Sequence, residues 1–210
     1  MNARSALRAA GFTVVEMMIA LAVFAVLLAL GVPRMADWVA STKAAAAREF
    51  YAEGLGLARA KALSHNSASR LVLNRNANSG QYDWQVDLCF PTPEEPCSEA
   101  SGEWSTLEEG VKPAGSAGDG FTSVARSADT LPTTARLSVT PGPDGETSVY
   151  FTPLGWVDTR VAARLMRIDL EPVDASEAPF PATSVVLTLA GVAAKCDPNA
   201  ADNDSRRCPE

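Results

Sequence analysis

GFTVVEMMIALAVFAVLLALGVP, residues Gly11 to Pro33, is the stretch that decides the fold. From Phe12 to Val32 it contains a single ionisable residue, Glu16. About 21 residues at a rise of 1.5 Å give roughly 31 Å of helix, which matches the hydrocarbon core of a bilayer. The stretch therefore predicts a membrane-spanning helix over residues 12–33.

The residues on either side of this stretch predict its orientation. Residues 1–10 contain Arg4 and Arg8 and no acid. A positive flank stays in the cytoplasm, so everything after Val32 is expected on the other side of the membrane. A secretory signal peptide is the alternative, but it has a shorter apolar run followed by small residues at a cleavage site. Here the run is longer and ends in Gly31 to Arg34, which favours a membrane span.

Glu16 is the unusual residue of the span. A carboxylate within a bilayer costs about 2.5–3.5 kcal/mol on insertion scales, so we expect it to have a partner. The alternative is that Glu16 lies close enough to the helix end to reach the headgroups by snorkelling.

Residues 34–64 continue the helical pattern beyond the membrane. Pro33 lies at the junction and lacks a backbone N–H, so we expect it to kink or loosen the helix there. Four apolar residues spaced by seven, four and seven define the face expected to pack on a sheet: Val39, Ala46, Phe50 and Leu57.

After residue 64 the period changes to that of β-strands. Tyr82, Trp84, Val86 and Leu88 alternate with polar residues, which indicates an antiparallel strand with one buried face. The sequence therefore predicts an α+β fold, with a long N-terminal helix packed on antiparallel β-sheet in a head formed by residues 65–210. The six expected strands are Arg70–Asn74, Tyr82–Phe90, Leu137–Thr140, Ser148–Thr152, Leu165–Leu170 and Ser184–Leu189.

Residues 91–120 form a polar, acidic segment between two of these strands. Thirty residues without strong periodicity predict a long surface loop. Its glutamates lack the D-x-D-x-D-G spacing of a calcium loop, so we interpret them as solvated charges. The same interpretation applies to the tail residues Asp197, Asn199, Asp202 and Asp204, and we predict no metal site.

The four cysteines fall into two close pairs, Cys89 with Cys97 and Cys196 with Cys208. This spacing predicts two local disulfides and an oxidising compartment. Zinc binding is the alternative, but neither pair has C-x-x-C spacing and the one histidine, His65, is distant in the sequence.

Composition argues against two classes of function. The formal net charge of −7 and the pI near 4.8 do not favour a general electrostatic grip on nucleic acid. The chain has one histidine and lacks the G-x-S-x-G, phosphate-loop and H-E-x-x-H motifs. We therefore expect no enzyme activity and no cofactor, and we interpret His65 as an exposed turn residue.

The segment from Gly11 to Pro33 resembles the class III signal of type IV pilins and type II secretion pseudopilins. The resemblance implies that a prepilin peptidase cuts after Gly11, that the new N-terminal Phe12 is N-methylated, and that Glu16 meets the amine of Phe12 on a neighbouring subunit. Residues 1–11 are then a leader peptide, and the mature protein has 210 minus 11, or 199, residues. Its formal charge, 16 basic against 25 acidic residues, is −9.

Three further segments are similar to GspH/FimT-type minor pilins. The first, Leu55–Leu73, has an Ala-Arg pair at Ala58 and Arg59 before the turn into the first strand. The others are Val149–Val157 and the cysteine-closed C-terminal stretch Leu187–Pro198.

One difference from that family concerns DNA. Some FimT-like members have a Gly-Arg-x-Arg motif in the last turn that is associated with DNA uptake. Here Gly191 is followed by Val192, Ala193 and Ala194, so both arginine positions are apolar. Lys195, Arg206 and Arg207 are basic but lie among aspartates, which argues against DNA binding.

The resemblance implies a minor pilin of a type IV pilus, which assembles through its N-terminal helix into a priming or tip complex. The implied partners are the prepilin peptidase, other minor and major pilins, and the inner-membrane assembly platform. The implied location is the inner membrane, with a single pass and a periplasmic head. A GspH-type minor pseudopilin of a type II secretion system and a DNA-binding minor pilin for natural transformation are the alternatives.

Overall fold

The structure, a computed structural model, describes residues 12–92, 95–143, 145–176 and 179–209. The leader peptide predicted for residues 1–11, with Gly11 of the cleavage site, lies outside the described residues. The chain divides into two compact units, one up to Ala40 and one from Ser41 onward. The second unit therefore begins inside the segment that the sequence assigned to the helix continuation, residues 34–64.

One α-helix, α1, runs from Val14 to His65 and continues through Pro33. It ends close to the predicted position because the chain turns into a left-handed conformation at Asn66, where φ is 46°. The N–H of Asn66 donates to the carbonyl of Leu63, and the N–H of Ser67 donates to that of Ala62. These two bonds form a Schellman cap, which satisfies carbonyls at the helix end.

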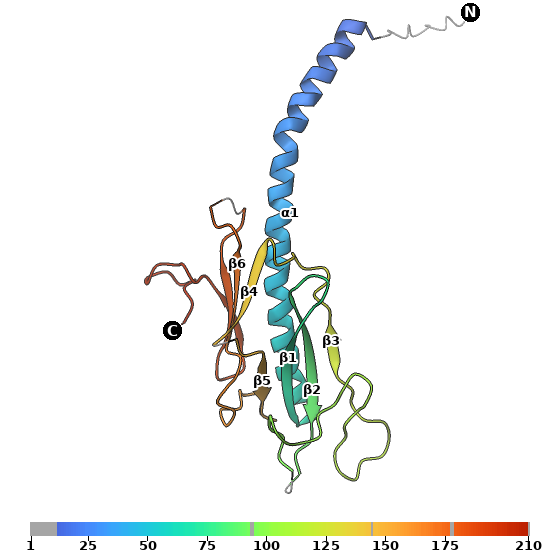
Figure 1. Cartoon of the computed structure of the whole chain (residues 1–210), viewed down its shortest axis with the longest axis vertical. Helices are drawn as coiled ribbons and strands as arrows, with labels where there is room; N and C mark the ends of the chain where they lie inside the picture. Colours follow the sequence, from blue (N-terminus) through green and yellow to red (C-terminus); the bar gives the residue numbers. More distant parts are fainter. Residues whose placement is uncertain (1–11, 93–94, 144, 177–178, 210) are drawn as a thin grey trace, which may run out of the picture. The chain divides into compact units, whose positions relative to one another are not determined.

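The rest of the second unit is built from two four-stranded sheets in which each strand is antiparallel to its neighbours (Figure 1). The first sheet has the order β3-β2-β1-β5 and the second β4-β6-β7-β8. The α+β fold expected from the sequence is confirmed. The strands are β1 Ala68–Arg75, β2 Tyr82–Cys89, β3 Val124–Arg126, β4 Leu137–Gly142, β5 Ser148–Phe151, β6 Arg167–Pro172, β7 Thr183–Leu187 and β8 Ala193–Cys196.

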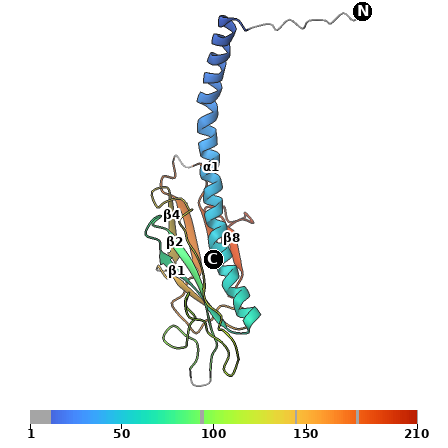
Figure 2. The ribbon, with the colours of Figure 1, turned by 90° about the vertical axis from the view of Figure 1, so that its right-hand side faces the viewer.

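Both sheets pack against the second half of α1, which runs alongside the strands (Figure 2). The predicted packing face was partly wrong: Phe50 is buried and Leu57 half-buried, but Ala46 and Val39 are exposed. Eleven residues at about 100° each leave Val39 only about 20° from Phe50 around the helix. The exposure of Val39 follows instead from its position along the helix, before Ser41, where the second unit begins. The buried positions are Ala47, Phe50, Tyr51, Gly54, Leu55, Ala58 and Ala62.

The small residues of this face allow α1 to approach the first sheet closely. A Cβ atom added at Gly54 would lie 2.9 Å from both Leu71 Cδ1 and Trp84 Cγ. Any other residue at position 54 would therefore clash with Leu71 and Trp84 and displace them. Trp84 in turn contacts Phe50, with ring centroids 5.9 Å apart.

Six of the eight strands coincide with predicted strands, with ends that differ by up to two residues. β3 and β8 were not predicted, since they are three and four residues long and lack an apolar alternation. The alternation predicted for β2 holds at Tyr82, Trp84 and Val86, but Asp87, expected on the solvent face, is 1% exposed. A segment that follows β2 covers it, as described below.

Candidate functional site

The N-terminal end of α1 is a capped helix start. Thr13 precedes the helix, and its Oγ1 accepts a hydrogen bond from the backbone N–H of Glu16 at 3.1 Å. Threonine at this position with glutamate three residues later is the sequence of a capping box. The Glu16 carboxylate lies in the first turn, where the helix dipole favours negative charge. The acid therefore has a local structural role in addition to the one expected from the sequence.

Up to Val32, the surface of α1 is apolar on all sides apart from Glu16. Phe12 is 83% exposed, and large apolar side chains remain exposed as far as Val39. α1 is long and apolar enough to cross a membrane, and its most apolar stretch is not buried within the chain. A helix that is apolar all round needs surroundings that are apolar all round. Lipid or neighbouring helices must therefore cover it.

Glu16 is the exception within this surface. It lies in an exposed turn and pairs with no cation among the described residues. A carboxylate in an apolar layer without a counter-charge is costly. Glu16 thus has no counter-charge within the described part of the chain, and both explanations expected from the sequence, an amine of a neighbouring subunit and snorkelling to the headgroups, stay predictions.

In the head, the cysteines form the two disulfides predicted from the sequence, Cys89–Cys97 and Cys196–Cys208. The first joins the end of β2 to the acidic segment, and both of its cysteines are buried. The second closes the C-terminal tail onto β8. Both bridges therefore fix segments without regular structure to the end of a strand, β2 in one case and β8 in the other.

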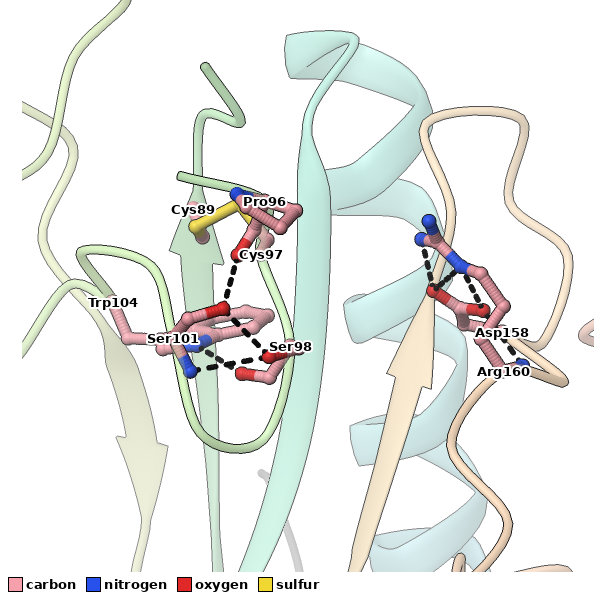
Figure 3. A network of polar contacts seen from close by, with 8 residues as sticks. All are labelled: Cys89, Pro96, Cys97, Ser98, Ser101, Trp104, Asp158 and Arg160. Carbon is pink, nitrogen blue, oxygen red and sulfur yellow. Dashed lines mark hydrogen bonds and ion pairs between the residues drawn. A yellow bond between two sulfur atoms is a disulfide. The ribbon is translucent and has the colours of Figure 1, made fainter. Parts of the chain in front are cut away.

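The acidic segment after β2 is tightly anchored (Figure 3). Trp104 Nε1 donates to the carbonyl of Ser98 at 2.9 Å, and the hydroxyls of Ser98 and Ser101 lie 2.8 Å apart. The Trp104 ring packs edge-on against Tyr150 and lies beneath the Arg70 guanidinium, 4.6 Å from the ring centroid. Part of the predicted long loop is therefore a cover for the outer face of the first sheet.

This cover explains the burial of Asp87. Its carboxylate accepts hydrogen bonds from Arg70 Nε at 2.7 Å, Gln85 Nε2 at 2.7 Å and the Ser123 hydroxyl at 2.6 Å. Ser105 adds a further link, because its hydroxyl contacts that of Ser123 and accepts from the N–H of Leu88. A buried carboxylate needs such partners, and here they come from both the sheet and the segment that covers it.

The three segments that resemble GspH/FimT-type pilins meet at one point. Arg59 Nε, from α1, donates to the carbonyl of Gly155 at 3.1 Å. A Cβ atom on Gly191 would lie 2.2 Å from that same carbonyl oxygen and 3.0 Å from Arg59 Cδ. Gly155 and Gly191 also have positive φ angles of 73° and 75°. Only glycine combines that conformation with so close an approach.

The basic residues near the C-terminus are each paired with an acid. Lys195 pairs with Glu49 of α1, Arg207 with Asp202, and Arg206 with Asp204. Hydrogen bonding to Arg206 lowers the pKa of Asp204 to about 2. These cations are thus neutralised within the chain, which leaves little charge to attract phosphate.

His65 is held at the end of α1. Its Nδ1 lies 3.0 Å from the carbonyl of Lys61 and 2.8 Å from the Ser64 hydroxyl, and its ring packs edge-on against Phe121. These contacts give the side chain a structural role at the turn into β1.

Among the described residues, no group of three or more His, Cys, Asp or Glu side chains is arranged to hold a metal ion.

Comparison with known proteins identifies the N-terminal segment. A family model described as a prokaryotic N-terminal methylation motif matches residues 7–32. No curated protein and no solved structure matches the chain. The match supports a type IV pilin-like protein, implies processing by prepilin peptidase and, with the apolar helix, indicates membrane anchoring.

Proposed function

We propose that this chain is a minor pilin of a type IV pilus, anchored in the inner membrane with its head in the periplasm. It acts by assembling through the first part of α1 into a priming or tip complex, without catalysing a reaction. The proposal depends on one observation, the apolar stretch from Phe12 to Val39, most of which lies in α1. Its methylation motif and its exposed apolar surface are both suited to lateral packing with other membrane helices.

Two features support the minor-pilin assignment over a general pilin-like role. The three segments similar to GspH/FimT-type proteins lie far apart in sequence, and they meet where Arg59 bonds to Gly155 beside Gly191. The C-terminal tail is closed by the Cys196–Cys208 disulfide, and the type IV pilus members of that family often end in such a tail. This second feature favours a pilus over a type II secretion system. DNA binding is not favoured, because the nearby cations are paired with acids.

Assembly is proposed to depend on Glu16 and the amine of Phe12 on a neighbouring subunit. Glu16→Gln removes the charge but retains the size of the side chain. We expect wild-type amounts of cleaved, membrane-bound protein, since a neutral residue inserts more easily than a carboxylate. Incorporation into the filament or its priming complex should fall by at least about tenfold, the effect of losing roughly 1.4 kcal/mol.

The measurement is co-purification of the full-length variant with its partner pilins, together with N-terminal sequencing of the membrane fraction. Thr13→Ala is the matched control, because it removes the helix cap at the same site and leaves the acid in place. If Glu16→Gln co-purified as efficiently as the wild type, the acid would not direct docking. A mature N-terminus beyond Val32 would contradict the pilin assignment itself.

A further inference from the structure

The second half of α1 lies between two strands that are each at the edge of a sheet. Glu49 pairs with Lys195 of β8, and Glu53, one turn further along, pairs with Arg126 of β3. Figure 1 shows β3 on one side of α1 and the second sheet on the other. β3 and β8 therefore border the head on opposite sides of the same helix.

The other two sheet edges are covered or blunted. The backbone N–H groups of Asp158 and Leu165 donate to carbonyls of β5, at Tyr150 and Ser148 respectively. On β4, Pro141 has no N–H, and Gln81 Nε2 donates to the carbonyl of Leu137 at 2.8 Å. Proteins protect sheet edges in these ways to prevent unwanted pairing. Among the described residues, the outer edges of β3 and of β8 up to Lys195 have no such cover.

The outer edge of β8 has unused backbone groups. The N–H of Thr188 donates to the carbonyl of Val192 within the hairpin, whereas the N–H of Asp197 donates to Arg206 on the opposite side. Because backbone groups alternate along a strand, Ala193 and Lys195 point theirs away from β7. They face a groove of about 570 Å³ beside α1, where a Cβ atom on Gly56 would meet nothing within 4 Å.

Exposed apolar side chains extend this edge into a larger face. Gly155 lies against Leu63, and the N–H of Val157 donates to the carbonyl of Leu189, so the α1 end and the two turns are in contact. We call this surface the Trp156 face. It consists of Leu154 (70% exposed), Trp156 (62%), Leu189 (55%), Val192 (48%) and Leu63 (47%).

A second apolar surface lies on the β3 side. The N–H of Ser123 donates to the carbonyl of Thr106, and Val111 pairs with Phe121, so these two stretches lie side by side. We call this surface the Leu107 face. It consists of Leu107 (56% exposed), Phe121 (44%) and Val124 (38%).

The two faces carry opposite charge. Arg59, at the Trp156 face, donates to a carbonyl and pairs with no carboxylate among the described residues. Glu108 and Glu109 adjoin the Leu107 face and form no ion pair within the described part of the chain. They outnumber Lys112 of the same segment, whose Nζ donates to the carbonyl of Gly118. Contacts between other surfaces of this acidic chain would be repulsive on average, whereas these two faces attract each other.

We propose that the Trp156 face of one copy docks on the Leu107 face of a second copy. The inference rests on the proposed function, assembly through the first part of α1, and adds a contact between heads to it. The two faces are different, so the contact is heterologous and can repeat as an open chain. Each face covers on the order of a few hundred Å², less than the roughly 800 Å² per partner of a stable complex. Anchoring in one membrane supplies the effective concentration that this small contact needs.

Photo-crosslinking of the full-length chain in proteoliposomes tests the contact. Benzoylphenylalanine replaces Val192, and a 1:1 mixture of isotope-labelled and unlabelled copies separates intermolecular from intramolecular products. We expect intermolecular cross-links that map to residues 106–126 of the second copy. Leu107→Asp should lower their yield about tenfold, corresponding to about 1.4 kcal/mol. Val173→Asp, at a residue that is 57% exposed and belongs to neither face, is the matched control and should leave the yield unchanged.

A mixture of variants tests the heterologous geometry. Trp156→Ser copies and Leu107→Asp copies should each fail to associate alone, but a mixture retains one intact pair of faces and should form cross-linked dimers without longer chains. Failure of the mixture to restore dimers, cross-links between two Trp156 faces, or an absence of intermolecular cross-links would overturn the proposal. If Glu16-dependent incorporation into the filament persisted in that case, the proposed function would stand without this contact.

Discussion

The two halves of α1 belong to one continuous helix but have opposite relations to the rest of the chain. Up to Ala40, the large apolar side chains are exposed; Leu27, for example, is 62% exposed. From Ala47 onward, one face is buried against the sheets, and Leu55 is 1% exposed. The comparison shows that helix formation and burial within the chain are separate properties of this sequence.

The difference follows from how apolar residues are distributed around the helix. Up to Val32, the first half is apolar on every side apart from Glu16, so no single face is specified for packing on a sheet. The second half packs one row of apolar and small residues, from Ala47 to Ala62, against the sheets and leaves Glu49 and Glu53 exposed. One half is therefore suited to an environment supplied by lipid or other subunits, and the other to the core of its own head.

Matched leucine substitutions test this comparison most strongly. Leu55→Ala should lower the free energy of unfolding of the head by about 2–5 kcal/mol, because it leaves a cavity between α1 and the sheets. Leu27→Ala removes the same atoms from the exposed half and should leave that free energy unchanged. Denaturant titration of the full-length variants in detergent, followed by the fluorescence of buried Trp84, gives both values.

The comparison would fail if the two substitutions had equal effects. A loss of head stability in Leu27→Ala would mean that the first half of α1 contributes to the core. A negligible effect of Leu55→Ala would mean that the packing between α1 and the sheets does not limit stability.

A second prediction extends the comparison to the two disulfide-closed segments. Replacing Cys89 and Cys97 with alanine should lower the free energy of unfolding by about 2–3 kcal/mol. By chain entropy alone, the Cys196–Cys208 bridge should stabilise the head by about 0.4 kcal/mol more than the Cys89–Cys97 bridge, because it closes a longer loop. We nevertheless expect the Cys89–Cys97 pair to have the larger effect, because it also holds the segment that covers Asp87 and Tyr150.

Denaturation of the two double-alanine variants in parallel decides between these accounts. If the variant that lacks Cys196 and Cys208 were the less stable, loop entropy would outweigh the contacts of the acidic segment. The buried hydrogen bonds of Asp87 would then contribute little.

The sequence predicted the helix, six strands and both disulfides because each has a local signal. The apolar run identifies the span, and alternation along β2 identifies a half-buried strand. The Schellman cap at Asn66 falls at the end of the helical pattern. These features depend on residues close together in the chain, which is the range over which periodicity is informative.

The features that could not be predicted from the sequence depend on contacts between residues that are far apart in the chain. β3 and β8 are short edge strands, and their pairing is set by neighbours already in the sheet. Asp87 looked solvent-facing because its cover, through Ser105 and Ser123, comes from a polar segment without periodicity. No local pattern distinguishes a solvated acidic loop from one that folds back over a sheet. Trp104, an isolated aromatic residue in that segment, was the signal available.

The smallest predicted effect concerns acid stability, in which the head should differ from the apolar half of α1. Asp158 accepts hydrogen bonds from Arg160 Nε at 2.9 Å and from a terminal guanidinium nitrogen at 2.5 Å (Figure 3). The hydrogen bond to the Arg160 side chain lowers the pKa of Asp158. The pair therefore stabilises the head above the unfolded-state pKa near 3.9. This contribution is lost as pH falls through the lower folded-state pKa. Since the Arg160 side chain is largely exposed, the contribution should be less than about 1 kcal/mol.

Denaturant titrations at pH 7 and pH 3 should show a slightly smaller pH dependence in Asp158→Asn than in the wild type. An equal pH dependence in the two proteins would show that the pair contributes nothing measurable to the stability of the head.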